Sequence, residues 1–383
     1  MSSRASDLPE LTKAEAQRYS RQLVLPEVGQ DGQRRLKASS VLVIGAGGLG
    51  IPASIYLAAA GVGRVGIVDH DRIEKSNLHR QTLYSEADVG KSKAVVASER
   101  LRLVNPHVSI TPYEMKLDSS NALGLLERYD VTVDCTDNFP ARYLINDASV
   151  LLRKPDVYAS VLRFDGQVSV FDARRGPCYR CLFPEPPPPD SVQDCAVAGV
   201  LGGLPGMMGS LQAVQAVMLA LSEGEPLVGR LVLFNGVDMT FSELRVKKNP
   251  DCPVCGKNPT VRSLIDYEEF CGLKRRADQV EEITPVELER LMEGSEKIVL
   301  LDVREPSEYD FCRIEGSKLI PLGELDQRSV ELRKDARIIV YCHVGVRSAT
   351  AARLLGSKGF RAASLRGGIR AWSDEVDPNV AVY

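Results

Sequence analysis

A glycine-rich turn between two apolar segments constrains the fold of this chain more than any other feature. Val41 to Ile44 reads as a strand buried on both faces, the turn spans Gly45 to Gly50, and a small-residue helix at 52–60 leads to a second strand at 65–68. A strand–helix–strand unit of this kind builds a parallel sheet covered by helices. Its glycines (Gly45, Gly47, Gly48 and Gly50) allow close backbone approach to a ligand at a helix N-terminus, so we expect a Rossmann-like, nucleotide-binding α/β domain.

The rest of this domain continues the same alternation of strands and helices. Further strands are predicted at 108–111, 131–134, 157–161, 168–171 and 231–234, and helices at 91–103, 141–152 and 208–221, after a helical arm at 18–37.

A second, smaller α/β domain is predicted near the C-terminus. Charge rises and the strand pattern stops at 261–282; then Thr284-Pro285-Val286-Glu287 gives a capping box with proline at the first helical position. Strands at 298–303 and 338–341 and a helix from Ser348 follow. The expected organisation is a domain at 1–260, a linker at 261–282 and a domain at 283–383.

Composition excludes several classes of function. A net charge of −3 and a sequence pI of about 6.0 give no support for nucleic-acid binding. The uncharged stretch from Cys195 to Ser222 is interrupted by Gly202-Gly203 and Pro205-Gly206, which favours a buried helix over a membrane span. With no signal peptide evident, we expect a cytoplasmic protein whose nine cysteines serve as metal ligands or reactive thiols.

Polar residues after the glycine turn indicate which nucleotide chemistry is involved. Asp69 ends the next strand, where an acid commonly binds ribose. A nicotinamide-dependent dehydrogenase is the default interpretation of such a turn. The later polar residues fit phosphates and Mg²⁺ better than a hydride, because cations neutralise a leaving pyrophosphate and carboxylates bind magnesium. They are Asp71, Asn77, Arg80, Lys93 and Asp137.

Two C-x-x-C pairs, Cys178 with Cys181 and Cys252 with Cys255, predict a metal site. Four thiolates make a closed, tetrahedral zinc site with no open position for catalysis. Thioredoxin-like redox chemistry is the alternative for one such pair, but two pairs in one chain favour structural Zn²⁺.

A cysteine loop, Cys342 to Arg347, follows one predicted strand and precedes a helix. Backbone N–H groups, the helix dipole and Arg347 are expected to lower the thiol pKa and to stabilise a persulfide. Cysteine phosphatases use a loop that is one residue longer between cysteine and arginine. The shorter loop favours sulfur chemistry, with Cys342 as nucleophile.

These motifs resemble two known families. Residues 18–245 resemble the ThiF/MoeB adenylyltransferases, relatives of ubiquitin-activating enzymes, in Arg18 to Gln22, Gly45 to Gly50, Asn77 to Gln81 and Cys135 to Asn138. Residues 283–383 resemble a rhodanese domain in the cysteine loop and in three framing motifs. These motifs are Leu301 to Arg304, Ile314 to Ser317 and Gly367 to Trp372. Arg313 departs from the histidine that relatives often carry.

The resemblance implies ATP-dependent adenylation of the C-terminal glycine of a small ubiquitin-like sulfur carrier that ends in Gly-Gly. Asp69 would bind ribose, Arg80 and Lys93 the phosphates, and Asp137 Mg²⁺. Arg21 would reach into the neighbouring subunit's ATP site, which implies a homodimer. Cys342 would then carry a persulfide supplied by a desulfurase or thiosulfate and form the carrier thiocarboxylate.

Several alternatives stay open at this stage. Cys195 corresponds to a reactive thiol in the family's crossover loop, and it either forms a thioester first or resolves a disulfide with Cys342. A nicotinamide-dependent oxidoreductase fused to a sulfurtransferase, a non-catalytic scaffold for a ubiquitin-like protein, and activation of a modifier for protein conjugation are the competing functions.

Overall fold

The computed structural model describes residues 8–187, 199–272, 280–294 and 297–381, and it divides into two compact units. The larger unit continues to Phe270, and the smaller begins at Cys271. Within the segment 261–282, helix α11 (Tyr267–Phe270) packs on the larger unit and strand β9 (Glu281–Ile283) joins the smaller sheet.

The larger unit is built on an eight-stranded sheet of order β3-β2-β1-β4-β5-β6-β7-β8. The first five strands in this order are parallel, and β6 to β8 add antiparallel neighbours. The strands are β1 (Ser40–Ile44), β2 (Arg64–Val68), β3 (Ser109–Tyr113), β4 (Val131–Asp134), β5 (Asp156–Leu162), β6 (Asp165–Phe171), β7 (Arg230–Asn235) and β8 (Thr240–Arg245).

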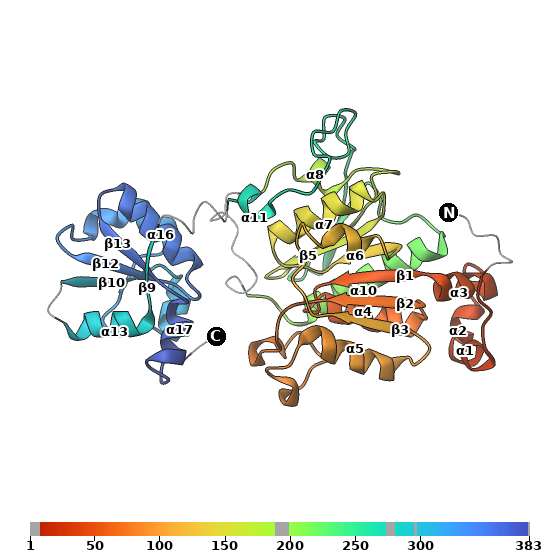
Figure 1. Cartoon of the computed structure of the whole chain (residues 1–383), viewed down its shortest axis with the longest axis horizontal. Helices are drawn as coiled ribbons and strands as arrows, with labels where there is room; N and C mark the ends of the chain where they lie inside the picture. Colours follow the sequence, from red (N-terminus) through yellow and green to blue (C-terminus); the bar gives the residue numbers. More distant parts are fainter. Residues whose placement is uncertain (1–7, 188–198, 273–279, 295–296, 382–383) are drawn as a thin grey trace. The chain divides into compact units, whose positions relative to one another are not determined.

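Helices cover both faces of this sheet (Figure 1). One set packs together against β1, β2 and β4 to β6: α4 (Gly50–Ala60), α5 (Lys93–Val104) and α10 (Gly203–Leu221). On the other face lie α6 (Ala122–Leu126) and α7 (Phe139–Leu151). The central strands β1 and β4 are buried along their whole length, as their apolar sequences predict.

Two differences from the sequence prediction have local causes. The predicted arm at 18–37 is three short helices, α1 (Lys13–Arg18), α2 (Ser20–Leu23) and α3 (Gly29–Ala38). Pro26 separates α2 from α3, because it cannot donate the hydrogen bond that helix continuation needs. Strand β8 has no counterpart in the prediction, since all six of its residues are exposed and carry no burial pattern.

Helix α10 is long and apolar enough to cross a membrane by length and composition. It packs against α4, β4, β5 and β6, and Met208, Gln212 and Ala216 are fully buried there. Its place in the protein core therefore accounts for its composition.

The smaller unit is a five-stranded, fully parallel sheet of order β11-β10-β12-β13-β9. Alternate residues of β12 enter separate apolar clusters, Ile338 and Val340 in one, Ile339 and Tyr341 in the other, so both faces are covered. The remaining elements are β10 (Ile298–Asp302), β11 (Lys318–Leu319), β12 (Arg337–Tyr341), β13 (Arg361–Leu365), α13 (Pro285–Glu293), α14 (Pro306–Phe311), α15 (Leu325–Arg328), α16 (Val346–Ser357) and α17 (Gly368–Glu375).

Candidate functional site

The predicted nucleotide-binding residues gather at one edge of the larger sheet. The glycine turn follows β1, Asp69 follows β2 and Asp137 follows β4. These strands are parallel and adjacent, so their carboxyl ends meet there. The strand order reverses between β1 and β4, the position at which open α/β sheets bind ligands.

The glycine turn requires glycine on steric grounds at two positions. Gly45 has φ of +97°, and a Cβ there would lie 2.7 Å from the carbonyl oxygen of Cys135. A Cβ on Gly50 would lie 1.7 Å from the carbonyl oxygen of Gly45. At Gly47, by contrast, the nearest neighbour would be Gln81 Nε2 at 3.6 Å, which leaves room for a ligand.

Asp69 connects the loops that follow β1 and β2. Its buried carboxylate accepts the N–H of Ala46 at 2.7 Å and the N–H of Asp71 at 2.8 Å. Burial raises the pKa of Asp69, and the charge of Lys93 opposes that shift. The residue predicted to bind ribose therefore also fixes the backbone of the glycine turn.

Lys93 and Arg80 supply positive charge beside this edge. Lys93 starts α5, is buried, and pairs through Nζ with Asp71 Oδ2 at 2.8 Å. Arg80 lies beside Gly48, and its Nη1 donates to Ser76 O at 2.9 Å and contacts His79 Nε2 at 2.8 Å. Burial, with the charge of Arg80, lowers the pKa of His79, so its neutral ring can accept that bond.

The other predicted site residues differ in setting. Asn77 is buried, and its Oδ1 caps a short 3₁₀ turn by accepting the N–H of Glu74. Asp137 is exposed directly after β4, and Arg21 is exposed on α2. Cys195 lies outside the described residues.

Two residues at this edge were not selected from the sequence. The Tyr84 hydroxyl lies 2.9 Å from Ala46 O and 3.1 Å from Lys93 O. Gln81 is buried, and its Oε1 has no hydrogen-bond partner among the described residues. The motif from Asn77 to Gln81 pointed to Gln81, but no local pattern marked Tyr84.

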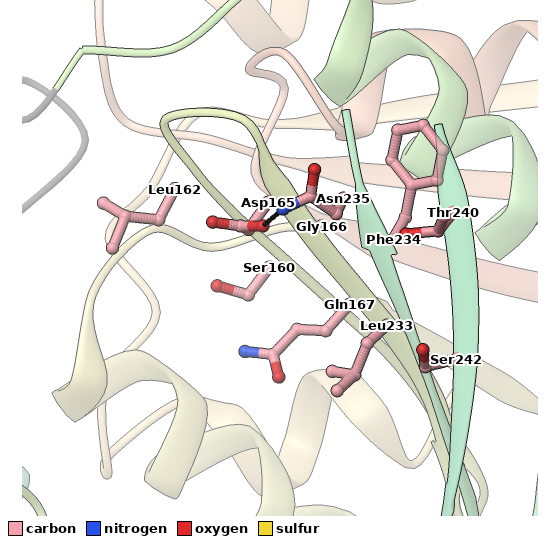
Figure 2. Close-up of a pocket in the computed structure, with 10 residues that line it drawn as sticks. All are labelled: Ser160, Leu162, Asp165, Gly166, Gln167, Leu233, Phe234, Asn235, Thr240 and Ser242. Atoms are coloured by element: carbon pink, nitrogen blue, oxygen red, sulfur yellow. Dashed lines mark hydrogen bonds between the residues drawn. The ribbon is translucent and has the colours of Figure 1, made fainter. Parts of the chain in front are cut away.

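A cavity of about 430 Å³ opens on the antiparallel part of the same sheet (Figure 2). Two rows of residues cross β5 to β8 in register and line this cavity. One row is Ser160, Gln167, Leu233 and Ser242, and the other is Leu162, Asp165, Asn235 and Thr240. Both rows lie on the face of the sheet away from α10, because Gly166, between them, faces α10, and Phe234 enters the core.

This cavity is connected to the nucleotide edge through Arg142 of α7. Its Nη2 donates to Thr136 O at 3.2 Å and to Ser160 Oγ at 3.0 Å. Thr136 precedes Asp137, and Ser160 lines the cavity. One guanidinium therefore links the metal-binding candidate with the cavity.

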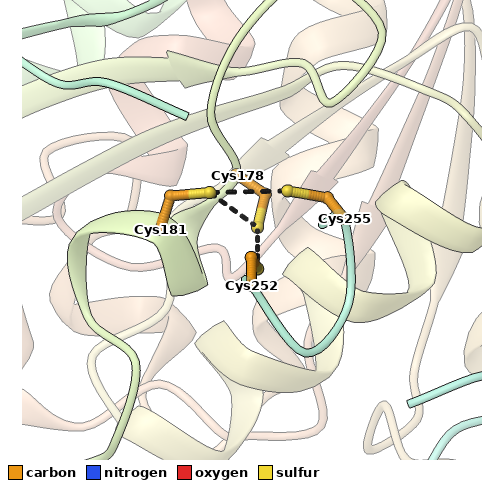
Figure 3. Close-up of side chains that lie close together, drawn as sticks. All are labelled: Cys178, Cys181, Cys252 and Cys255. Atoms are coloured by element: carbon orange, nitrogen blue, oxygen red, sulfur yellow. Dashed lines mark hydrogen bonds between the residues drawn. The ribbon is translucent and has the colours of Figure 1, made fainter. Parts of the chain in front are cut away.

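The four cysteines of the two C-x-x-C pairs come together (Figure 3). Their Sγ atoms lie within 4.8 Å of one another, at 3.9 Å for Cys178–Cys181, 3.6 Å for Cys178–Cys252 and 3.4 Å for Cys181–Cys255. A zinc tetrahedron with Zn–S bonds of about 2.3 Å has S···S edges of about 3.8 Å. The donor set and its spacing therefore fit Zn²⁺.

The residues between Cys178 and Cys181 anchor this cluster in the domain. Arg180 is buried, and its guanidinium binds both carboxylate oxygens of Asp147 at 2.9 and 2.8 Å. It lies over the rings of Tyr143 and Phe270, 4.9 and 4.4 Å from their centroids. Arg180 thereby fastens α8 (Tyr179–Leu182) to α7 and α11.

Cys252→Ser should destabilise the larger unit, because a bound metal contributes folding free energy that three thiolates cannot retain. We expect a loss of about 4 kcal/mol, equivalent to a fall in Tm of roughly 8–16 °C. Differential scanning calorimetry would measure the fall in Tm, and zinc analysis would measure the loss of bound metal. Cys135→Ser, which changes a buried cysteine outside the cluster, should keep its zinc, and wild-type zinc content in Cys252→Ser would contradict the assignment.

In the smaller unit the cysteine loop joins β12 to α16 as predicted. The Cys342 Sγ is buried and accepts the N–H of Gly345 at 3.2 Å, with Ser348 Oγ at 3.6 Å. Gly345 has φ of +98° and precedes the first turn of α16, which directs its N–H at the sulfur.

The glycine pair before α17 holds this loop in shape. The N–H groups of Ile369 and Arg370 donate to the carbonyls of Cys342 and His343 at 2.8 and 3.2 Å. A Cβ on Gly368 would lie 2.4 Å from both of these carbonyl oxygens. Burial lowers the pKa of His343, so the loop gains no charge from this ring at neutral pH.

Arg347, the last residue of the cysteine loop, is paired with an acidic residue. Its two terminal nitrogens each contact one oxygen of the Glu308 carboxylate at 2.7 Å, and both side chains are largely buried. Glu308 belongs to α14 and was not selected from the sequence. The pair balances the charge of Arg347 and fixes the end of the cysteine loop.

Two family models match the chain, one on each unit. The ThiF family model matches residues 19–254, and the rhodanese-like domain model matches residues 284–375.

Two similar proteins match 97% of this chain and are named for both activities, and a third matches a shorter part of it. The "probable adenylyltransferase/sulfurtransferase MoeZ" of Mycobacterium tuberculosis is 43% identical over 384 residues, which cover 97% of this chain and 96% of that protein. The mouse "adenylyltransferase and sulfurtransferase MOCS3" is 43% identical over 406 residues, covering 97% and 88%. The "sulfur carrier protein adenylyltransferase" of Thermus thermophilus is 56% identical over 268 residues, covering 69% and 99%.

Among solved structures, MccB of E. coli crystallised with ATP has a TM-score of 0.55 at 23% identity, covering 64% of this chain and 75% of that one. At this identity the likeness shows the fold alone. The family models and the relatives carry the assignment. The chain therefore belongs to the ThiF family, as an adenylyltransferase with a C-terminal rhodanese-like sulfurtransferase domain.

Proposed function

We propose that the chain converts the C-terminal glycine of a small ubiquitin-like sulfur carrier into a thiocarboxylate, with ATP in the larger unit and a persulfide in the smaller. The main support is the convergence of the glycine turn, Asp69, Lys93 and Asp137 on one sheet edge, in a chain that also holds a buried thiol under a backbone N–H. The Thermus relative is named for acting on a sulfur carrier protein.

In the first step the carrier carboxylate attacks the α-phosphorus of ATP, and the bond to pyrophosphate breaks. Lys93 and Arg80 would neutralise the charge that develops on the leaving group, while Asp71 holds Lys93 in place. Asp69 would bind the ribose, and Asn77 would complete the nucleotide site. Mg²⁺ held by Asp137 would supply further charge neutralisation on the phosphates.

The cavity on β5 to β8 is our candidate for carrier docking. It combines Leu162 and Leu233 with polar neighbours, and the adjoining hairpin exposes Val237 and Met239. The Arg142 link leads from this face to Asp137. A carrier bound here could extend its thin glycine tail along the sheet to the α-phosphate.

Leu233→Asp should weaken carrier binding, because a charge would replace apolar contact at the cavity floor. We expect KM for the carrier to rise about ten-fold while KM for ATP stays within about two-fold. Steady-state pyrophosphate release gives both constants. Val214→Asp, which alters an exposed valine of α10, should change neither; equal effects of the two substitutions would contradict this docking site.

Sulfur transfer would follow at Cys342. The thiolate attacks the outer sulfur of a donor, and that sulfur is transferred to Cys342. The rest of the donor leaves, as sulfite from thiosulfate or as a thiolate from a desulfurase persulfide. The terminal sulfur on Cys342 then attacks the acyl-adenylate carbon, AMP leaves, and an acyl disulfide forms. Arg347, held by Glu308, would keep the loop in the shape that stabilises the persulfide.

A second thiol completes the cycle. Its attack on Cys342 Sγ releases the carrier thiocarboxylate and leaves a disulfide, which a thiol reductant opens. Cys195 would be this thiol, or it would first form a carrier thioester. Arg21, exposed on α2, would serve the ATP site of a second subunit in a homodimer. A reducing cytoplasm suits Zn²⁺ held by four thiolates together with these reactive thiols.

Intact-mass analysis of a carrier ending in Gly-Gly tests this proposal. The carrier is incubated with enzyme, Mg·ATP, thiosulfate and a thiol reductant. We expect one oxygen of the carrier to be replaced by sulfur, with release of pyrophosphate and AMP. Pyrophosphate without sulfur would refute the sulfur-transfer half. Neither product with several carriers, together with NAD binding, would refute the whole proposal.

A further inference from the structure

Tyr84 lies between the glycine turn and α5, in a position that motif analysis did not mark. Its ring is buried, and its hydroxyl faces two backbone carbonyls, Ala46 O at 2.9 Å and Lys93 O at 3.1 Å. A tyrosine hydroxyl carries one hydrogen, so the two carbonyls share it. Burial raises the pKa of Tyr84 well above its ordinary value, so the hydroxyl keeps this hydrogen at every physiological pH.

These contacts close a ring of hydrogen bonds around the nucleotide edge. Ala46 N–H donates to Asp69, and Asp69 also accepts the N–H of Asp71. The N–H of Lys93 donates to Asp71 O at 3.0 Å, and its Nζ pairs with the Asp71 carboxylate. Tyr84 then joins Lys93 O back to Ala46 O. Asp69 and Asp71 connect the glycine turn to the start of α5 through the loop after β2. Among the described contacts of this ring, the Tyr84 hydroxyl connects the same two elements through a single group.

We propose that Tyr84 is a positioning residue for adenylation, which acts by holding Lys93 at a fixed distance from the glycine turn. The inference rests on the proposed role of Lys93 at the phosphates. A cation that stabilises charge on a leaving pyrophosphate must be held in place before that charge develops, because a displacement of about 1 Å can cost on the order of 100-fold in rate. Asp71 holds the ammonium group and the N–H of Lys93, and Tyr84 holds its carbonyl against the glycine turn.

Tyr84→Phe separates this role from packing, because phenylalanine keeps the buried ring and loses only the hydroxyl. Without the shared hydrogen, the two carbonyl dipoles face each other directly, and we expect the start of α5 to move away from the turn. The full-length Tyr84→Phe enzyme should release pyrophosphate about ten-fold more slowly at saturating ATP and carrier, with KM for ATP within about three-fold of wild type.

Tyr129→Phe is the matched control. Tyr129 is also buried, and its hydroxyl is 3.0 Å from that of Tyr113, a contact that does not involve the glycine turn. Both substitutions remove the hydroxyl of one buried tyrosine and should lower Tm similarly, whereas only Tyr84→Phe should lower kcat. A wild-type kcat in Tyr84→Phe, or the same fall in both variants, would overturn the proposal.

A double-mutant cycle with Lys93→Met tests whether Tyr84 acts through Lys93. If it does, Tyr84→Phe should slow the Lys93→Met enzyme no further, whereas independent effects would multiply. Multiplying effects would overturn the proposal. If Lys93→Met itself keeps the wild-type rate, the role of Lys93 in the proposed function is refuted, and the Tyr84 inference is refuted with it. If Lys93→Met is slow and Tyr84→Phe has the wild-type rate, the Tyr84 inference alone is refuted.

Discussion

Cys342→Ala should abolish thiocarboxylate formation while the first turnover of pyrophosphate release keeps its wild-type rate. The thiol is the only group of the cysteine loop that can carry a transferable sulfur, and it is already aligned with the Gly345 N–H and the start of α16. Loss of a covalent nucleophile typically costs at least about 10³-fold. Intact-mass analysis of the carrier and a pyrophosphate assay in the same reaction separate the two steps.

Cys312→Ala provides the matched control for this variant. Cys312 is buried in the same unit, where its Sγ contacts Arg304 Nη1 at 3.6 Å, outside the cysteine loop. We expect it to retain thiocarboxylate formation. Sulfur incorporation by Cys342→Ala at the wild-type rate would show that sulfide or another thiol attacks the acyl-adenylate directly, and Cys342 would lose its assigned role.

Asp137→Asn should produce the opposite pattern. It should reduce pyrophosphate release by about 10²–10³-fold, because an amide binds Mg²⁺ weakly and the phosphate charge would be left poorly neutralised. Loading of Cys342 from thiosulfate should be unchanged, since that reaction needs neither ATP nor the larger unit's site. Pyrophosphate release and sulfite release from thiosulfate are the two measurements.

Asp118→Asn tests whether this effect is specific to position. Asp118 is exposed in the loop after β3 and accepts the N–H of Ser120, so its replacement removes an equal charge from the same unit. It should leave pyrophosphate release within about two-fold of wild type. Equal losses in both variants would point to a general electrostatic effect and remove Asp137 from the metal site.

Local sequence patterns predicted much of the fold. Apolar runs such as Val41 to Ile44 and Val131 to Asp134 are buried strands, because a parallel strand covered on both faces needs apolar side chains on both. The capping box at Thr284 forms as predicted, with its side chain accepting the N–H of Glu287 at 3.1 Å. In each case the residues that carry the signal are also the residues that make the structure.

Patterns failed where a partner distant in sequence supplies the stabilisation. Strand β8 exposes every side chain and exists through its pairing with β7, so no periodicity could mark it. The helical arm was predicted as one element, although Pro26 separates α2 from α3, which then pack on each other. The cavity on β5 to β8 depends on the register of four strands, which no single segment contains.

The sequence by itself identified the candidate chemistry-bearing groups, because glycine turns, C-x-x-C pairs and the cysteine loop need fixed residue types at short, fixed spacings. The tertiary structure decided how these groups are held. The Tyr84 hydroxyl reaches Ala46, and Glu308 reaches Arg347 across 39 positions. The fold, and not chain spacing, sets these distances, so the residues that position the reactive groups became visible only in three dimensions.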